Sequence, residues 1–143
     1  MNIFAKPHQE DVMALLRDCA LPTEDLKPSH FANFFGCGLE DDPGGIVGIE
    51  MHGSVALLRS LAVRTSCRGN GCAKELIMMA EMHAGKLGAQ EIYLLTNTAE
   101  GLFASQGYSV IARDKVPSEI KETTEFSSIC PDNATVMVKK IAA

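Results

Sequence analysis

The chain has 143 residues, a length typical of one globular domain, and 46% of them are hydrophobic while 22% are charged. The net charge of −5 at pH 7 argues against a protein that binds nucleic acid or lies on an anionic membrane. No apolar run is long enough to cross a membrane, and residues 1–6 are not followed by the apolar core of a signal peptide. We therefore expect a single domain over residues 1–143.

The cysteines indicate the redox environment of the protein. They are Cys19, Cys37, Cys67, Cys72 and Cys130, an odd number without any Cys-x-x-Cys pair. This pattern favours reduced thiols, and hence a cytoplasmic protein, over a disulfide framework. The four histidines are scattered along the chain, so we expect no metal site.

The first half of the chain is predicted to contain three strands and two helices. In chain order, the predicted elements are a strand at 3–5, a helix from Pro7, a loop at 21–26 leading into a second short helix, and strands at 45–51 and 55–63. The boundary between helix and strand within 28–35 stays open. Turn-forming residues at 42–44 and 52–54 flank the strand at 45–51, so the last two strands should form a hairpin.

The second half of the chain alternates helices and strands. A long helix is predicted at 71–86 because its apolar residues recur every three or four positions, and Gly88 should end it. The remaining predicted elements are a strand at 91–96, a helix capped by Asn97 and Glu100 that ends at Gly107, a strand at 108–112, a helical insert at 117–120 and a strand at 134–141. This alternation predicts a mixed α/β sheet with helices on its faces.

A glycine-rich segment between the strand at 55–63 and the long helix is the best candidate for chemistry. It reads Arg68-Gly69-Asn70-Gly71-Cys72-Ala73. Glycines let several backbone N–H groups converge on one anion, and a helix N-terminus adds partial positive charge. The segment lacks the complete motifs of a P-loop or a dinucleotide fold, and a plain glycine turn is the alternative.

Basic residues gather around this segment. Residues 59–74 contain Arg59, Arg64, Arg68 and Lys74 and no acid, within a chain of net charge −5. A basic island of this kind suits a ligand with several phosphates, and coenzyme A has three phosphate groups. A solvated basic face is the alternative.

These residues resemble the acetyl-CoA loop of the GNAT superfamily, Arg/Gln-x-x-Gly-x-Gly/Ala, at Arg68, Gly71 and Ala73. A finer resemblance, over about 21–141, is to the arsenic-resistance branch, whose members acetylate arsinothricin and phosphinothricin. The stretches that carry it include 57–63, 94–100, 107–108, 124–126 and 130–131. The region 94–108 also resembles the acetyltransferase domain of N-acetylglutamate synthases. The resemblance implies a GNAT fold, with a central mixed β-sheet of six or seven strands flanked by about four helices.

The resemblance also implies acetyl-CoA as the co-substrate. Backbone groups of the strand that ends at Val63 would bind the pantetheine arm, and the glycine-rich segment would hold the pyrophosphate. The implied coenzyme-binding residues are Leu61, Ala62, Val63, Arg68, Gly69, Asn70, Gly71, Cys72, Ala73 and Phe103. A backbone N–H near Leu61 would stabilise the oxyanion of the tetrahedral intermediate.

The catalytic side chains are not evident from the sequence. Many GNAT enzymes use a tyrosine as general acid at the position that Phe103 occupies here, so no side-chain acid is assigned there. Thr65 also replaces a common proline, and Leu102 replaces a phenylalanine usual in the arsenic branch. Tyr108 is a substitute acid, with a sheet aromatic as its alternative role. Glu50 and, beside it, His52 are candidate bases.

Both relatives imply a glutamate-like substrate. Arg59 lies mid-strand among apolar residues and could pair with a substrate carboxylate, or else with Glu50. Ser60, the second candidate, should point to the opposite face from Arg59 unless the strand bulges. Thr96 and Thr98 complete the predicted substrate-binding residues, with strand-end and helix-cap roles as their alternatives.

The resemblance therefore implies an acetyl-CoA-dependent N-acetyltransferase acting on the α-amino group of a small glutamate-like amino acid, with arsinothricin or phosphinothricin preferred. Two alternatives stay open. One is N-acetylation of glutamate or another ordinary amino acid, and the other is a module that binds CoA without turnover. Nucleic acid and membranes are not expected partners, and a homodimer is compatible with the family.

Overall fold

The computed structural model describes residues 2–123, 126 and 134–141. Cys130 and the stretches 124–125 and 130–131, named above, lie outside these residues. Over the described part the strands form one seven-stranded mixed sheet, which confirms the predicted fold class. In sheet order the strands are β1 (Ile3–Ala5), β2 (Phe34–Leu39), β3 (Asp42–His52), β4 (Val55–Val63), β5 (Glu91–Thr96), β7 (Thr135–Lys140) and β6 (Ser109–Val110).

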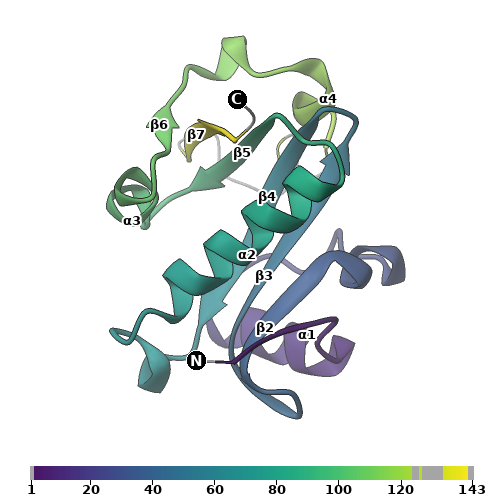
Figure 1. The fold of residues 1–143 in the computed structure, drawn as a ribbon, viewed down its shortest axis with the longest axis vertical. Helices are drawn as coiled ribbons and strands as arrows, with labels where there is room; N and C mark the ends of the chain where they lie inside the picture. The colour runs from purple at the N-terminus through teal and green to yellow at the C-terminus, as the bar shows by residue number, and fades with distance from the viewer. Residues whose placement is uncertain (1, 124–125, 127–133, 142–143) are drawn as a thin grey trace.

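Helices cover both faces of the sheet. The longest, α2, crosses one face, and α1 packs on the other (Figure 1). The helices are α1 (Gln9–Asp18), α2 (Cys72–Lys86), α3 (Glu100–Ser105) and α4 (Ser118–Lys121), with 3₁₀ turns at Pro28–Asn33, Thr65–Cys67 and Arg113–Lys115. None of the helices in the described part of the chain is long and apolar enough to cross a membrane.

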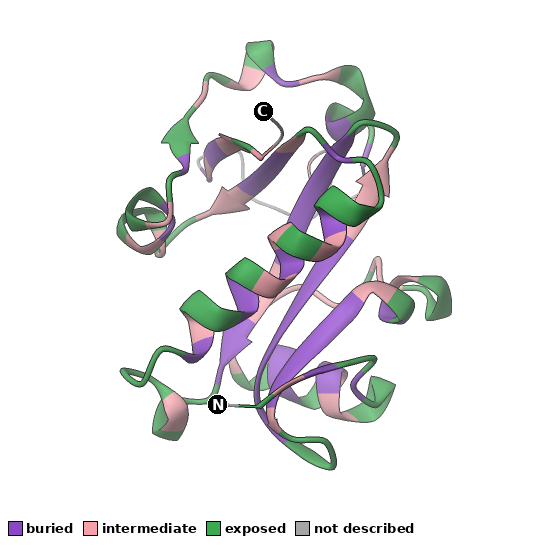
Figure 2. Ribbon diagram, in the orientation of Figure 1, coloured by how far each residue is buried: buried purple, intermediate pink, exposed green. Residues whose placement is uncertain are grey.

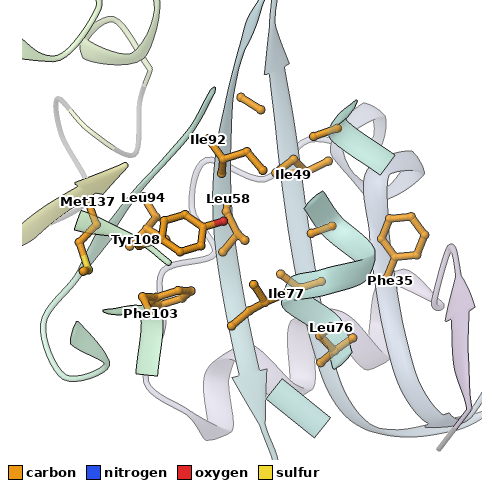
Figure 3. Packing of buried hydrophobic residues seen from close by; sticks show 14 of the residues in the cluster. Phe35, Ile49, Leu58, Leu76, Ile77, Ile92, Leu94, Phe103, Tyr108 and Met137 are labelled. Atoms are coloured by element: carbon orange, nitrogen blue, oxygen red, sulfur yellow. The ribbon is translucent and has the colours of Figure 1, made fainter. Parts of the chain in front are cut away.

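Successive side chains of β4 point to opposite faces of the sheet and so belong to different apolar clusters of the core. Ala56 and Leu58 face α2, in the largest apolar cluster, whereas Val55 and Leu57 face α4 on the opposite side. Figure 2 shows β3 and β4 buried along most of their length between the two helical layers. Figure 3 shows the α2 side of the core, where side chains from β3, β4, β5 and β7 meet α2 and the ring of Phe103.

The sheet opens between its two central strands. Strands β4 and β5 run parallel but pair only from Val55 to Leu57 and from Glu91 to Tyr93. Beyond Leu57 and Tyr93 the two strands have no pairing, while each stays paired to its other neighbour, β3 or β7. The carboxyl ends of β4 and β5 are therefore not paired to each other.

Local sequence patterns were wrong about three boundaries. Residues 42–44, predicted as a turn, begin β3, because antiparallel pairing with β2 extends that strand to Asp42 and puts the turn at 40–41. Helix α3 begins at Glu100 without an Asn97 cap, since the Thr96 hydroxyl accepts the Ala99 N–H instead, at 3.0 Å. The strand predicted at 108–112 spans only residues 109–110.

Gly45 lets helix α2 approach the sheet closely. A Cβ at this position would lie 2.7 Å from the Cys72 sulfur and 3.3 Å from the Ala62 carbonyl oxygen. Gly45→Ala should therefore lower the free energy of unfolding by about 1–3 kcal/mol, because the start of α2 must move away from β3. Urea denaturation tests this expectation. In the matched control Gly85→Ala, the added methyl meets only Ile141 at 3.9 Å, and the free energy of unfolding should rise by about 0.5–1 kcal/mol.

Candidate active site

A β-bulge shapes the end of β4. Ile46 pairs with Ala62 and Gly48 pairs with Arg59, so two residues of β4, Ser60 and Leu61, stand opposite one residue of β3. Ser60 adopts a φ of 59°, which is uncommon for a residue other than glycine. The bulge resets the alternation of side chains, and as a result Arg59 and Ser60 line the same cavity.

An outer cleft of about 390 Å³ lies at the start of α2. Gly69 and Gly71 have φ values of 83° and 87°, and Gly71 is the N-cap of the helix. The N-terminal N–H groups of a 15-residue helix and two left-handed glycines make a suitable cradle for phosphate. Predicted coenzyme-binding residues that line this cleft are Leu61, Val63, Arg68, Gly69, Gly71, Cys72 and Ala73.

Side chains support the cradle in two ways. The Arg68 guanidinium is anchored because its Nε donates to the Val63 carbonyl at 3.1 Å. Burial, together with a hydrogen bond to Cys37, raises the pKa of the Cys72 thiol to about 12, so Cys72 stays uncharged and does not repel an anion. Ala62 and Asn70, also predicted to bind the coenzyme, line neither cavity in the structure, and Ala62 packs on the α1 side.

An inner cavity of about 560 Å³ occupies the opening between β4 and β5. It lies next to the outer cleft, because Leu61 and Ala99 line both spaces. The four predicted substrate-binding residues, Arg59, Ser60, Thr96 and Thr98, all line the inner cavity. Phe103, predicted to contact the coenzyme, lines this inner cavity as well, from helix α3.

The Arg59 guanidinium is held by two carboxylates. Its Nη1 donates to Asp25 and to Glu50, the latter at 2.6 Å, and its Nη2 donates to the second Asp25 oxygen at 2.8 Å. Its Nε donates to the Ser60 hydroxyl at 3.1 Å. Burial acts to raise the pKa of Asp25, but the hydrogen bonds and charge of Arg59 outweigh it and hold that pKa below its usual value. Arg59 is 3% exposed, so this is a desolvated cluster.

Comparison with known protein families identifies the family to which the chain belongs. Residues 2–108 match the family model described as Acetyltransferase (GNAT) family. The chain belongs to the GNAT acetyltransferase family. No curated protein shows significant sequence similarity to the chain.

Solved structures share the fold at low identity. N-acetylglutamate synthase from Neisseria gonorrhoeae, complexed with coenzyme A and N-acetyl-glutamate, has a TM-score of 0.83 at 16% identity over 99% of this chain and 35% of that one. This chain thus spans about a third of that enzyme. A Mycobacterium tuberculosis protein in complex with CoA and NLQ scores 0.79 at 17% identity, covering 98% and 99% of the two chains. An aminoglycoside 6'-N-acetyltransferase complexed with coenzyme A scores 0.72 at 15%, covering 100% and 98%.

The three candidate catalytic residues of this GNAT protein, Glu50, His52 and Tyr108, line neither cavity. Glu50 contacts Arg59 and, at 3.2 Å, the His52 ring, and it is not among the residues that line the inner cavity. Tyr108 is 3% exposed, and its hydroxyl donates to Glu81 of α2 at 3.0 Å. Burial, and then the Glu81 carboxylate, raise the pKa of Tyr108. Figure 3 shows its ring beside Phe103 in the core.

Tyr108→Phe tests the role of this hydroxyl. The change removes one buried hydrogen bond and should lower the free energy of unfolding by about 1 kcal/mol. Acetyl transfer should be unchanged, because the Tyr108 side chain lines neither cavity. Denaturation and CoA release by the same protein sample give the two readouts. A large loss of turnover in a stably folded variant would instead assign Tyr108 to catalysis.

Several site residues were not anticipated from the sequence. The inner cavity is also walled by Cys19, Ala20, Leu21 and Pro22, which follow α1. Asp25, which follows that wall, reaches Arg59 across 34 positions of the chain. No local pattern marks these residues, because the segment has no periodicity and no motif. The one available signal was the apolar setting of Arg59, which required an anionic partner.

Proposed function

We propose that the protein transfers the acetyl group of acetyl-CoA to the amino group of a small glutamate-like amino acid, with arsinothricin and phosphinothricin as the preferred substrates. The observation that carries the proposal is that the phosphate cradle lies next to an inner cavity lined by Arg59, with Leu61 and Ala99 shared by the two spaces. The structural likeness to N-acetylglutamate synthase supports a substrate of this size and charge. The cysteine pattern supports a cytoplasmic location.

The residues present suit acetyl-CoA. The N-terminus of α2 with Gly69 and Gly71 would hold the pyrophosphate, and the unpaired edge of β4 would bind the pantetheine arm. The thioester would then reach the inner cavity near Leu61. No group of three or more potential metal ligands occurs among the described residues.

The proposed reaction is a direct transfer. The substrate amine forms a bond to the thioester carbonyl carbon, the C–S bond breaks, and the CoA thiolate leaves. A backbone N–H near Leu61 would stabilise the oxyanion, and the bulge at Ser60 and Leu61, where two residues of β4 stand opposite one residue of β3, supports this role. The proton of the substrate ammonium leaves through water, since Glu50 does not line the inner cavity.

The test is CoA release, detected as free thiol, with arsinothricin, phosphinothricin and glutamate compared side by side. Enzyme without substrate gives the background from the protein's own five cysteines. Rapid release with the arsenic or phosphorus compound, and little with glutamate, supports the proposal. Faster release with glutamate would favour an ordinary amino acid acetyltransferase. Acetyl-CoA binding without CoA release in the presence of any of the three compounds would contradict the substrate assignment.

A further inference from the structure

Arg59 is the sole lysine or arginine that lines the inner cavity of the described structure. All 13 lysines and arginines of the chain fall within the described residues, and two others, Arg68 and Lys74, line the outer cleft. An anionic substrate group that enters the inner cavity therefore has one side-chain cation to pair with.

That cation already holds a carboxylate in the geometry a substrate would use. Asp25 binds the guanidinium through both of its oxygens, which is the bidentate arrangement that arginine forms with carboxylates and related anions. The side chains of Arg59 and Asp25 are only 1% and 4% exposed. A substrate anion and Asp25 cannot both occupy the same two donors.

The two carboxylates on Arg59 differ in how they are held. Glu50 belongs to β3 and is paired there with Leu57 of β4. Asp25 belongs to the segment between α1 and the 3₁₀ turn that starts at Pro28, outside any helix or strand. The same segment supplies Cys19, Ala20, Leu21 and Pro22 to the wall of the cavity. Movement of Asp25 away from Arg59 thus disturbs no sheet ladder and alters the wall that a substrate would touch.

We propose that Asp25 competes with the substrate for the guanidinium of Arg59. The anionic group of the substrate displaces Asp25 from the guanidinium on binding. This inference rests on the proposed function and extends it to substrate selection. An amine without an anionic group leaves Asp25 in place, whereas an anion with two oxygens on one atom can replace both Asp25 contacts. Glu50 stays on Arg59 in both states and keeps the guanidinium oriented.

Asp25→Asn removes the competing charge with little change in shape. The KM for phosphinothricin and for glutamate should fall by roughly tenfold, because a like charge at the same guanidinium opposes the substrate anion. The kcat should stay near that of the parent protein, and the KM for leucinamide, an amine without a carboxylate, should not change. Asp42→Asn is the matched control, since it removes the same charge from an exposed pair with Arg64 and should leave every KM unchanged.

An unchanged or raised KM for both anionic amines, in an Asp25→Asn protein that unfolds cooperatively, would overturn the competitor role. Failure of the proposed function gives a different result. If no amine releases CoA from either protein, calorimetric titration with phosphinothricin still compares the two, and tighter binding to Asp25→Asn supports the inference. Equal binding to both proteins, or none, overturns it.

Discussion

Replacing Arg59 with methionine is expected to lower the free energy of unfolding by about 3 kcal/mol, because two carboxylates lose their shared partner in a desolvated place. Methionine keeps an unbranched apolar stem but lacks the guanidinium, so the change reports mainly on the loss of the charged group. The Asp25 and Glu50 side chains are only 4% and 12% exposed, so little water can reach their oxygens to replace the lost guanidinium contacts. Urea denaturation measures the effect.

Arg64 provides the matched control for this experiment. It forms the same kind of ion pair, with Asp42 at 2.9 Å, but its side chain is 43% exposed and that of Asp42 is 62% exposed. Arg64→Met should therefore change the unfolding midpoint little, since exposed pairs are screened by water and salt. Equal effects at the two positions would mean that the Arg59 cluster is not desolvated.

Placing phenylalanine at Ala99 is expected to reduce acetyl transfer by about 100-fold while acetyl-CoA still binds. Ala99 lines both the outer cleft and the inner cavity, so a large ring there would separate the thioester from the amine. The glycines and the N-terminal residues of α2 that form the phosphate cradle keep their identity in this variant. Calorimetric titration with acetyl-CoA and measurement of CoA release give the two readouts.

Ala104→Phe is the control for this prediction. Ala104 lies on the same helix, α3, but it is exposed and lines neither cavity. Transfer by this variant should match that of the parent protein. If Ala99→Phe retained full turnover, the two spaces would not be joined at Ala99 in the reaction, and the proposed path of the thioester would need another opening.

Local pattern predicted those elements whose residues carry their own structural signal. The strands at Val55–Val63 and Glu91–Thr96 have the predicted bounds, because each is an apolar run between residues that favour turns. Helix α2 begins just after Gly71 as expected, since an apolar face with a 3.6-residue period follows the glycines. By contrast, β3 extends back through Pro43 and Gly44, where pairing with β2 outweighs the local preference for a turn.

The sequence by itself determined the glycine loop before a long helix, the basic island around it, and the need of a mid-strand arginine for an anionic partner. Only the tertiary structure decided that Ser60 turns to the same cavity as Arg59, because a bulge depends on the register with β3. It also decided that Asp25, and not Glu50 alone, holds that arginine. Both outcomes depend on contacts between residues distant in the chain, which periodicity and motifs do not record.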